Sequence, residues 1–249
     1  MDIAIQQVDA PPPVNRYITF SSPESFALAV CNSQKNWDGT LEYSGDKRNW
    51  FKWDGTTTLS SADNKLYLRG TGNTKITGYS TRPTYFPNWV LTGSNISCKG
   101  NIETLLDYQT VLNGEHPIMA ESCYNCMFVG CTSLITAPTL SATTLTAGCY
   151  QSMFLNCTSL TIAPELLATT LASGCYYQMF CQCTSLTTAP PLPATILATA
   201  CYSSMFRGCI SLTAVPELPA TTLANSCYTS MFSDCSSIKV SETKTGTYT

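Results

Sequence analysis

The sequence predicts a mainly β protein with short helices, in which an N-terminal antiparallel, β-sandwich-like domain precedes a solenoid of 26-residue units. Two observations predict the solenoid. A pattern of Cys-Tyr, Met-Phe and Cys recurs every 26 residues from Cys123 to Cys235 without insertion or deletion. A fixed period of this length is typical of a solenoid, whose units bury their apolar faces only against each other. Charge also changes at this boundary, because between these two cysteines the only charged residues are Glu165, Arg207, Glu217 and Asp234.

Length and charge limit the functional classes. The chain has 249 residues, enough for two structural parts, and a net charge of −3. That charge argues against broad attraction to nucleic acid or to an anionic membrane. No apolar run approaches the roughly 18–20 residues of a membrane-spanning helix. Residues 1–6 lack the basic and apolar regions of a secretory signal. We expect a cytoplasmic chain, one that leaves by assembly into something larger, or one shown without its signal, and Met1 favours the first two.

Residues 1–16 are predicted to form an extended arm, because three consecutive prolines at 11–13 exclude helix and favour polyproline geometry. A disordered leader is the alternative. Residues 17–99 are predicted to form the β domain, from short runs rich in strand formers between turn residues. Those runs are 17–20, 41–43, 50–53, 65–69, 89–91 and 96–98. The turns are predicted at 38–39, 54–55 and 70–72.

Residues 100–122 are predicted to contain a capping helix and a lead-in to the repeats. Ile102, Leu105 and Leu106 have helical spacing, and Asn101 is a plausible N-cap. Because terminal repeats need a polar outer cover, we expect this helix to cover the open face of the first unit. The solenoid then occupies 123–240, and residues 241–249 form a polar tail.

Within one unit, the apolar spacing predicts a short α-helix or 3₁₀ segment. In the third unit Cys175, Met179, Phe180 and Cys183 stand at i, i+4, i+5 and i+8, which is one helical face. Leu186 and later apolar residues then point inward from a strand that a proline ends. Stacked units would align identical residues into columns.

The repeat resembles a known family. Its sequence, Cys-Tyr-x-x-Met-Phe-x-x-Cys-Thr-Ser-Leu followed by Ala-Pro and Ala-Thr-Thr-Leu, looks like the BspA-type leucine-rich repeat of gut Bacteroidales and their phages. The Phe-x-x-Cys-x-x-Leu core at Phe180, Cys183 and Leu186 matches the family signature. The resemblance covers about half of the chain. It implies a leucine-rich-repeat solenoid with a non-enzymatic binding or adhesion role on a cell or particle surface, and it supplies no catalytic residues.

The fourteen cysteines suggest disulfides or a metal. Eight residues of helix would separate the two cysteines of one unit by about 12 Å, whereas a disulfide needs Cα atoms within about 7 Å. Pairing between units is closer to possible, but a column of five cannot pair completely. We therefore favour free thiols that pack as small apolar side chains. Zinc is disfavoured because Cys123 and Cys126 form the only Cys-x-x-Cys pair. No metal and no cofactor are expected.

An enzyme is not expected. Nucleophilic catalysis requires a base beside the nucleophile, and the only histidine, His116, lies with Glu115 in a turn-like segment. No glycine-rich phosphate loop or paired-carboxylate motif is present.

The tyrosine column is the leading candidate for binding. Each Tyr follows a buried Cys, so we expect it at the edge of the core with its hydroxyl in water. Packing at a layer boundary is one interpretation, and an aromatic ladder that stacks on sugar rings or on a protein is the other. Positions that differ between units would complete the surface. The candidate binding residues are Tyr124, Tyr150, Tyr176, Tyr202, Tyr228, Gln151, Tyr177 and Arg207.

The resemblance and the division of charge together predict a structural and recognition protein. The leading hypothesis is a phage virion appendage or decoration protein, present in many copies, that displays the solenoid for attachment to a host-surface glycan or protein. Multiple weak contacts would then give firm attachment. Its other partners would be virion or surface-assembly proteins. The alternative is an adhesin on the bacterial cell surface.

Overall fold

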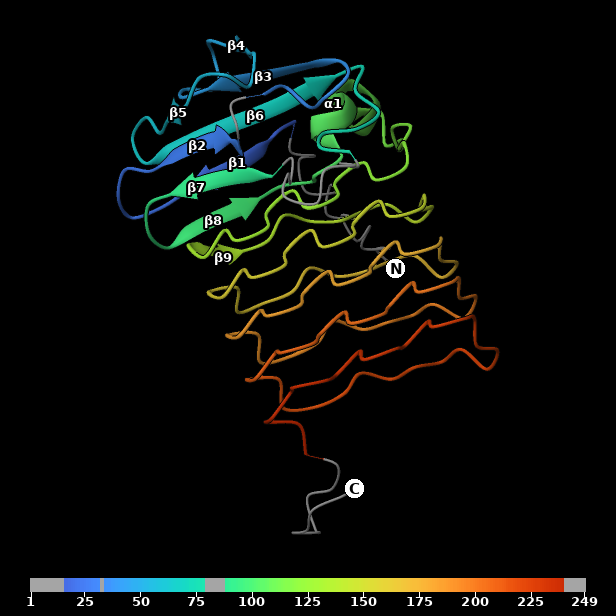
Figure 1. The fold of residues 1–249 in the computed structure, drawn as a ribbon. Coiled ribbons are helices and arrows are strands. Elements are labelled where there is room, and N and C mark those ends of the chain that lie inside the picture. Colours follow the sequence, from blue (N-terminus) through green and yellow to red (C-terminus); the bar gives the residue numbers. More distant parts are fainter. Residues whose placement is uncertain (1–15, 32–33, 79–87, 240–249) are drawn as a thin grey trace, which may run out of the picture.

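The computed structural model describes residues 16–31, 34–78 and 88–239. The protein is mainly β, with two sheets, one short helix and a stack of repeated units (Figure 1). The predicted arm lies outside the described residues except for Arg16, and the tail at 241–249 lies outside them entirely. We call residues 123–239 the array and each 26-residue repeat a coil.

Two sheets lie at one end of the molecule. The first has the strand order β4-β3-β6-β1-β8-β9, and the second has the order β5-β2-β7. All pairs are antiparallel except β8 with β9, which are parallel. The strands of the first sheet, in chain order, are β1 (Ile18–Ser21), β3 (Thr40–Ser44), β4 (Phe51–Trp53), β6 (Lys65–Thr71), β8 (Ile96–Lys99) and β9 (Leu134–Thr136). Those of the second are β2 (Ala27–Val30), β5 (Leu59–Ser60) and β7 (Trp89–Thr92).

Each strand predicted for residues 17–99 is present at its place, and two strands there, β2 and β5, were missed. The strand predicted after Leu186 in the third coil is wrong, because among the described coils only the first contains a strand, β9. The sequence of β2 is Ala-Leu-Ala-Val, in which two alanines weaken the strand signal. The turn predicted at 70–72 is wrong in part, because Gly70 and Thr71 belong to β6. Gly70 is required there for another reason: a Cβ atom at this position would collide with the carbonyl oxygen of Leu105.

The helix α1 (Thr104–Leu112) packs against β6 and is interrupted at Asp107, whose φ and ψ of −151° and 105° are extended. The Asp107 carboxylate accepts the N–H groups of Gln109 and Thr110 and so caps the second half. Asn101 is not the N-cap, which is Glu103. The Asn101 side chain instead accepts the N–H of Glu103, before the helix begins.

Each coil has two halves. The turn half is the nine-residue Cys-to-Cys segment, such as 175–183, and the proline half is the remainder, such as 184–200. In the turn half, the N–H of Met179 donates to the carbonyl of Tyr176 within its own coil (3.2 Å), and the N–H of Phe180 donates to Met205 in the next coil (2.9 Å). This alternation repeats along the turn half and in every coil that has a neighbour below it.

The helix predicted for this segment is therefore wrong. Gly174, Gln178 and Gln182 have φ of 58°, 53° and 61°, so every fourth residue is left-handed and the backbone forms a series of turns. A four-residue spacing fits both a helix and such turns. A helix would use its backbone groups internally, whereas this backbone uses half of its N–H groups to bind the next coil.

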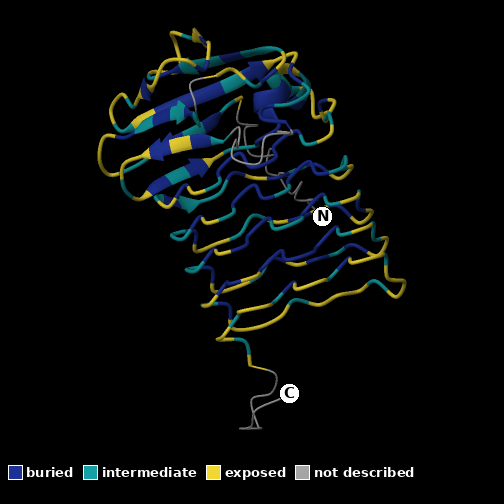
Figure 2. Cartoon of the chain, viewed as in Figure 1, coloured by how far each residue is buried: buried dark blue, intermediate teal, exposed yellow. Residues whose placement is uncertain are grey.

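Stacking aligns the coils into columns. The rings of Phe154 and Phe180 are 5.6 Å apart with an interplanar angle of 1°, and those of Tyr150 and Tyr176 are 5.9 Å apart at 6°. From the second coil to the fifth, the second Cys donates its S–H to a Phe carbonyl in the coil above, as Cys183 does to Phe154 (3.1 Å). Both aromatic columns are buried from the first coil to the fourth, and buried segments recur along the stacked coils (Figure 2).

The sheets cover the upper end of the array and share its core. The Trp89 N–H at the start of β7 donates to the carbonyl of Met127 (2.7 Å), and the Trp89 ring meets that of Phe128 at 6.1 Å. Ile76 donates to the carbonyl of Cys123 (2.9 Å). One continuous apolar cluster extends from the sheets through the coils. The cover expected from the helix alone is therefore provided mainly by the sheets.

Candidate functional site

The structure places the tyrosine column inside the core and not at its edge. Tyr124, Tyr150, Tyr176 and Tyr202 are almost fully buried, and only Tyr228 in the last coil is partly exposed. The expectation of hydroxyls in water is therefore wrong for the first four. The rings of Tyr150, Tyr176 and Tyr202 each lie between the rings of two neighbouring coils, so a ligand on the outside cannot stack on them. Burial also raises the pKa of these tyrosines.

The other predicted binding residues lie nearer to the surface. Gln151 and Tyr177 are half-buried, and both side chains border Gly174. Arg207 is exposed, and its Nε donates to Asp234 in the next coil (3.3 Å). An exposed pair of this kind contributes little to stability. The structure thus brings Gln151 and Tyr177 together but separates them from the tyrosine column.

The cysteine columns lie in the core with the aromatic ones. All fourteen cysteines are free thiols, and every one is buried except Cys31 and Cys235, which are half-buried. Burial raises the pKa of Cys131, Cys149 and Cys209 to about 12. Such thiols stay protonated at neutral pH and are poor nucleophiles. Within the described ranges, no three His, Cys, Asp or Glu side chains lie close enough together to hold a metal ion.

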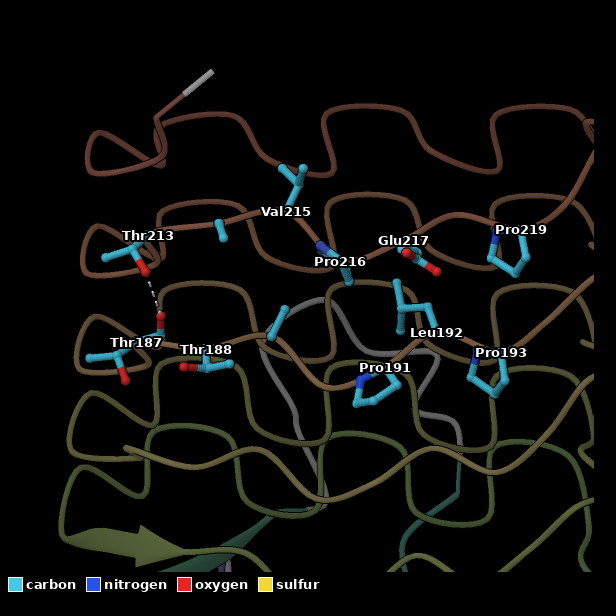
Figure 3. A pocket seen from close by; sticks show the side chains of 12 residues that line it. Thr187, Thr188, Pro191, Leu192, Pro193, Thr213, Val215, Pro216, Glu217 and Pro219 are labelled. Carbon is cyan, nitrogen blue, oxygen red and sulfur yellow. Dashed lines mark hydrogen bonds between the residues drawn. The ribbon is translucent and has the colours of Figure 1, made fainter. Parts of the chain in front are cut away.

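A groove of about 600 Å³ lies on the proline side of the array (Figure 3). It runs between the proline halves of the third and fourth coils, and its lining is mostly apolar. Val215 lies at the rim of the groove and is 55 % exposed, while Glu217 supplies the charge. The lining residues are Thr187, Thr188, Ala189, Pro191, Leu192, Pro193, Thr213, Ala214, Val215, Pro216, Glu217 and Pro219.

The groove lies where backbone hydrogen bonds between proline halves are missing. Between the second and third coils, the N–H of Leu171 donates to the carbonyl of Ile196 (2.9 Å) and holds the two proline halves together. No backbone hydrogen bond joins residues 188–198 to 214–224, all of which the structure describes. Pro193 and Pro219 replace the Leu167 of the second coil and add two proline rings to the lining. These extra prolines are the feature of the sequence that sets the third and fourth coils apart from the second.

A polar cluster around Glu103 connects the start of α1 to the first coil. Glu103 is only 1 % exposed, and its carboxylate accepts the Ser141 hydroxyl at 2.5 Å and contacts Nδ1 of His116 at 2.9 Å. His116 was expected beside Glu115 in a loop, and its partner is instead Glu103. The carboxylate stands between the serine and the histidine, so His116 does not contact Ser141 and the cluster lacks the Ser–His contact of a nucleophilic triad.

A membrane-spanning helix is absent from the parts of the chain that the structure describes, because none of its helices is long and apolar enough. Comparisons with known protein families, with curated proteins and with solved structures found no match.

Proposed function

We propose that the protein is a non-enzymatic structural and recognition protein, whose array is a leucine-rich-repeat solenoid of the BspA type after a β-sandwich-like domain. Its place would be on a phage virion, as an appendage or decoration protein that displays the array towards the host surface. The bonds between successive coils and the identical columns support the solenoid assignment. The buried thiols and the lack of contact between His116 and Ser141 are consistent with a non-enzymatic role.

The observation behind the recognition role is the proline-lined groove. Proline rings with Leu192 and Val215 offer an apolar, rigid surface on an array that has few charges. Exposed apolar patches with polar surroundings are typical of interaction sites. Rigid rings lose little conformational entropy on binding, so apolar or aromatic groups of a host-surface protein or glycan are suitable ligands.

Binding of the full-length protein to host cells tests this proposal. We expect Val215→Asp to weaken binding of the fluorescently labelled protein to gut Bacteroidales cells at least tenfold, because a carboxylate would stand in the apolar groove. Ile210→Asp is the matched control, since Ile210 is 47 % exposed, lies in the same coil and does not line the groove. Equal binding by both variants and the unaltered protein would refute the role of the groove.

Mass spectrometry of purified particles tests the location. A virion protein should be present at a constant ratio to the capsid protein across preparations. An adhesin would instead be released by protease treatment of intact bacterial cells and be absent from particles.

A further inference from the structure

The lower edge of the last turn half lacks the neighbour that every other turn half has. In the fourth coil, five N–H groups donate to the coil below, those of Ala200, Tyr202, Ser204, Phe206 and Gly208. The equivalent five groups in the fifth coil have no hydrogen-bond partner among the described residues: Ser226, Tyr228, Ser230, Phe232 and Asp234. We call residues 226–234 the lower edge.

The aromatic columns end at the same place. Tyr228 stacks on Tyr202 at 5.9 Å, and Phe232 stacks on Phe206 at 5.6 Å, but no described residue stacks on the other face of either ring. Exposure rises at the lower edge: Phe232 is half-buried, whereas its equivalent Phe206 in the coil above is fully buried. The lower edge therefore combines a row of hydrogen-bond donors with two uncovered ring faces.

The chemistry of the row restricts what can cover it. In every coil above, alternate N–H groups of the turn half donate to a row of backbone carbonyls in the next coil. The backbone of the lower edge presents only N–H donors, so a binding partner must supply a row of acceptors. Two lower edges cannot form this ladder with each other, because both would offer N–H groups. The upper carbonyls of a second copy are also occupied, since Cys123 and Met127 already accept the N–H groups of Ile76 and Trp89.

We propose that the lower edge binds a coil of the same repeat form from a different protein, one whose upper carbonyl row is not covered by sheets. The partner would add a coil to the array, with its carbonyls on the donor row and its aromatic rings on Tyr228 and Phe232. This is strand addition at an open edge, with turns in place of a strand. The interaction is independent of the groove and of host attachment.

A synthetic peptide of residues 147–183 is a suitable probe, because it contains two turn halves and leaves the carbonyls of the first uncovered. We expect saturable binding of the labelled, reduced peptide to the full chain and no binding of a scrambled peptide. Backbone amides at 226–234 should exchange with solvent quickly in the free protein and at least tenfold more slowly with the peptide.

Two variants locate the contact. Phe232→Glu should weaken peptide binding at least tenfold, and thermal melting shows whether this variant is folded. Ile162→Glu is the control, because Ile162 is 71 % exposed on the side of the array. Three results would overturn the proposal: no peptide binding, self-association of the full chain that protects the same amides, or binding that appears only when residues 240–249 are deleted. The second result would assign the edge to another copy, and the third would assign it to the chain's own tail.

Discussion

Phe180 shows how single residues join the coils. Its ring is fully buried and lies 5.6 Å from that of Phe154 and 5.7 Å from that of Phe206. Its backbone N–H is bonded to the next coil as well. Each ring of the column therefore packs against two neighbouring coils, and its removal would leave a cavity between them.

We expect Phe180→Ala to lower the free energy of unfolding by about 3–5 kcal/mol, the usual cost of removing a buried Phe ring. Urea denaturation of the reduced protein measures it. The exposed Ile162→Ala serves as the control and should cost less than about 0.5 kcal/mol. A loss below about 1 kcal/mol for Phe180→Ala would contradict the packing, because cavities in a core cost more than that.

The buried thiols make stability depend on alkaline pH. Cysteine in the unfolded chain titrates near its ordinary value of 9.0, and burial raises the pKa of Cys131, Cys149 and Cys209 to about 12 in the folded chain. Between these values the folded state holds protons that the unfolded state releases. Stability is therefore complete below about pH 9 and falls as the pH rises towards 12.

At pH 10 we expect a loss of about 1.4 kcal/mol for each such thiol relative to pH 8, since one pKa unit corresponds to about 1.4 kcal/mol. Urea denaturation at both pH values with reductant present gives the difference. Cys131→Ala should reduce the difference by the share of one thiol. An unchanged free energy of unfolding at pH 10 would show that these thiols are hydrated.

Burial also predicts the order in which the thiols react. Iodoacetamide should modify Cys31 and Cys235 first, because only these two are half-buried, and the remaining cysteines should need denaturant. Reductant should leave the melting temperature nearly unchanged. Peptide mass spectrometry after native alkylation measures the order, and rapid labelling of Cys157 or Cys183 would disagree with the core described above.

At the scale of elements, α1 and the loop after it depend on one buried carboxylate. Glu103 lies at the start of α1, and its partners come from the loop, through His116, and from the first coil, through Ser141. A buried charge of this kind is costly unless its partners remain in place. The contacts of Glu103 with His116 and Ser141 thus fix the loop after the helix against the array.

We expect His116→Ala to cost about 1.5–3 kcal/mol, the range for a hydrogen bond to a charged group. The cost should lie in the lower part of this range, since His116 is 51 % exposed and water can replace part of the hydrogen bond. Glu115→Ala is the control, because Glu115 is an exposed neighbour without a contact to Glu103. Equal stabilities of the two variants would exclude the proposed tie.

The repeat shows what periodicity can and cannot predict. The columns of Phe, Leu and Cys follow from the register of the repeat, and the structure confirms their burial. The turn half could not be told from a helix, because Met179 and Cys183 occupy one face in either geometry. The deciding feature is the left-handed backbone at Gln178 and Gln182. Glutamine does not favour this conformation by itself, so the residue type could not predict it. The bonds to the next coil impose it.

At the scale of the whole molecule, the two sheets and the array depend on each other. The sheets satisfy the carbonyls of the first coil and share its core. The strands themselves were predictable from their residue types, but this contact was not. It joins residues far apart in sequence, such as Trp89 and Met127, whose pairing no local pattern indicates.

Deletion of the sheets should therefore unfold or aggregate the array. A fragment of residues 101–249 exposes the Phe128 ring and the free carbonyls of the first coil, so we expect no cooperative unfolding transition in calorimetry. The full chain should show one, because its core is continuous. A fragment that melts cooperatively at the temperature of the full chain would show that the array folds without the sheets.

The ladder between coils also determines how the molecule would respond to mechanical force. Below the first coil, which the sheets also hold, each coil is bonded to its neighbours, and among the described residues the fifth has a neighbour on one side only. A pull applied at the C-terminal end would peel coils off singly, starting there, and each detached coil of 26 residues would release about 90 Å of extended chain. Extension in equal steps would let the array absorb a load in stages while the sheets stay intact.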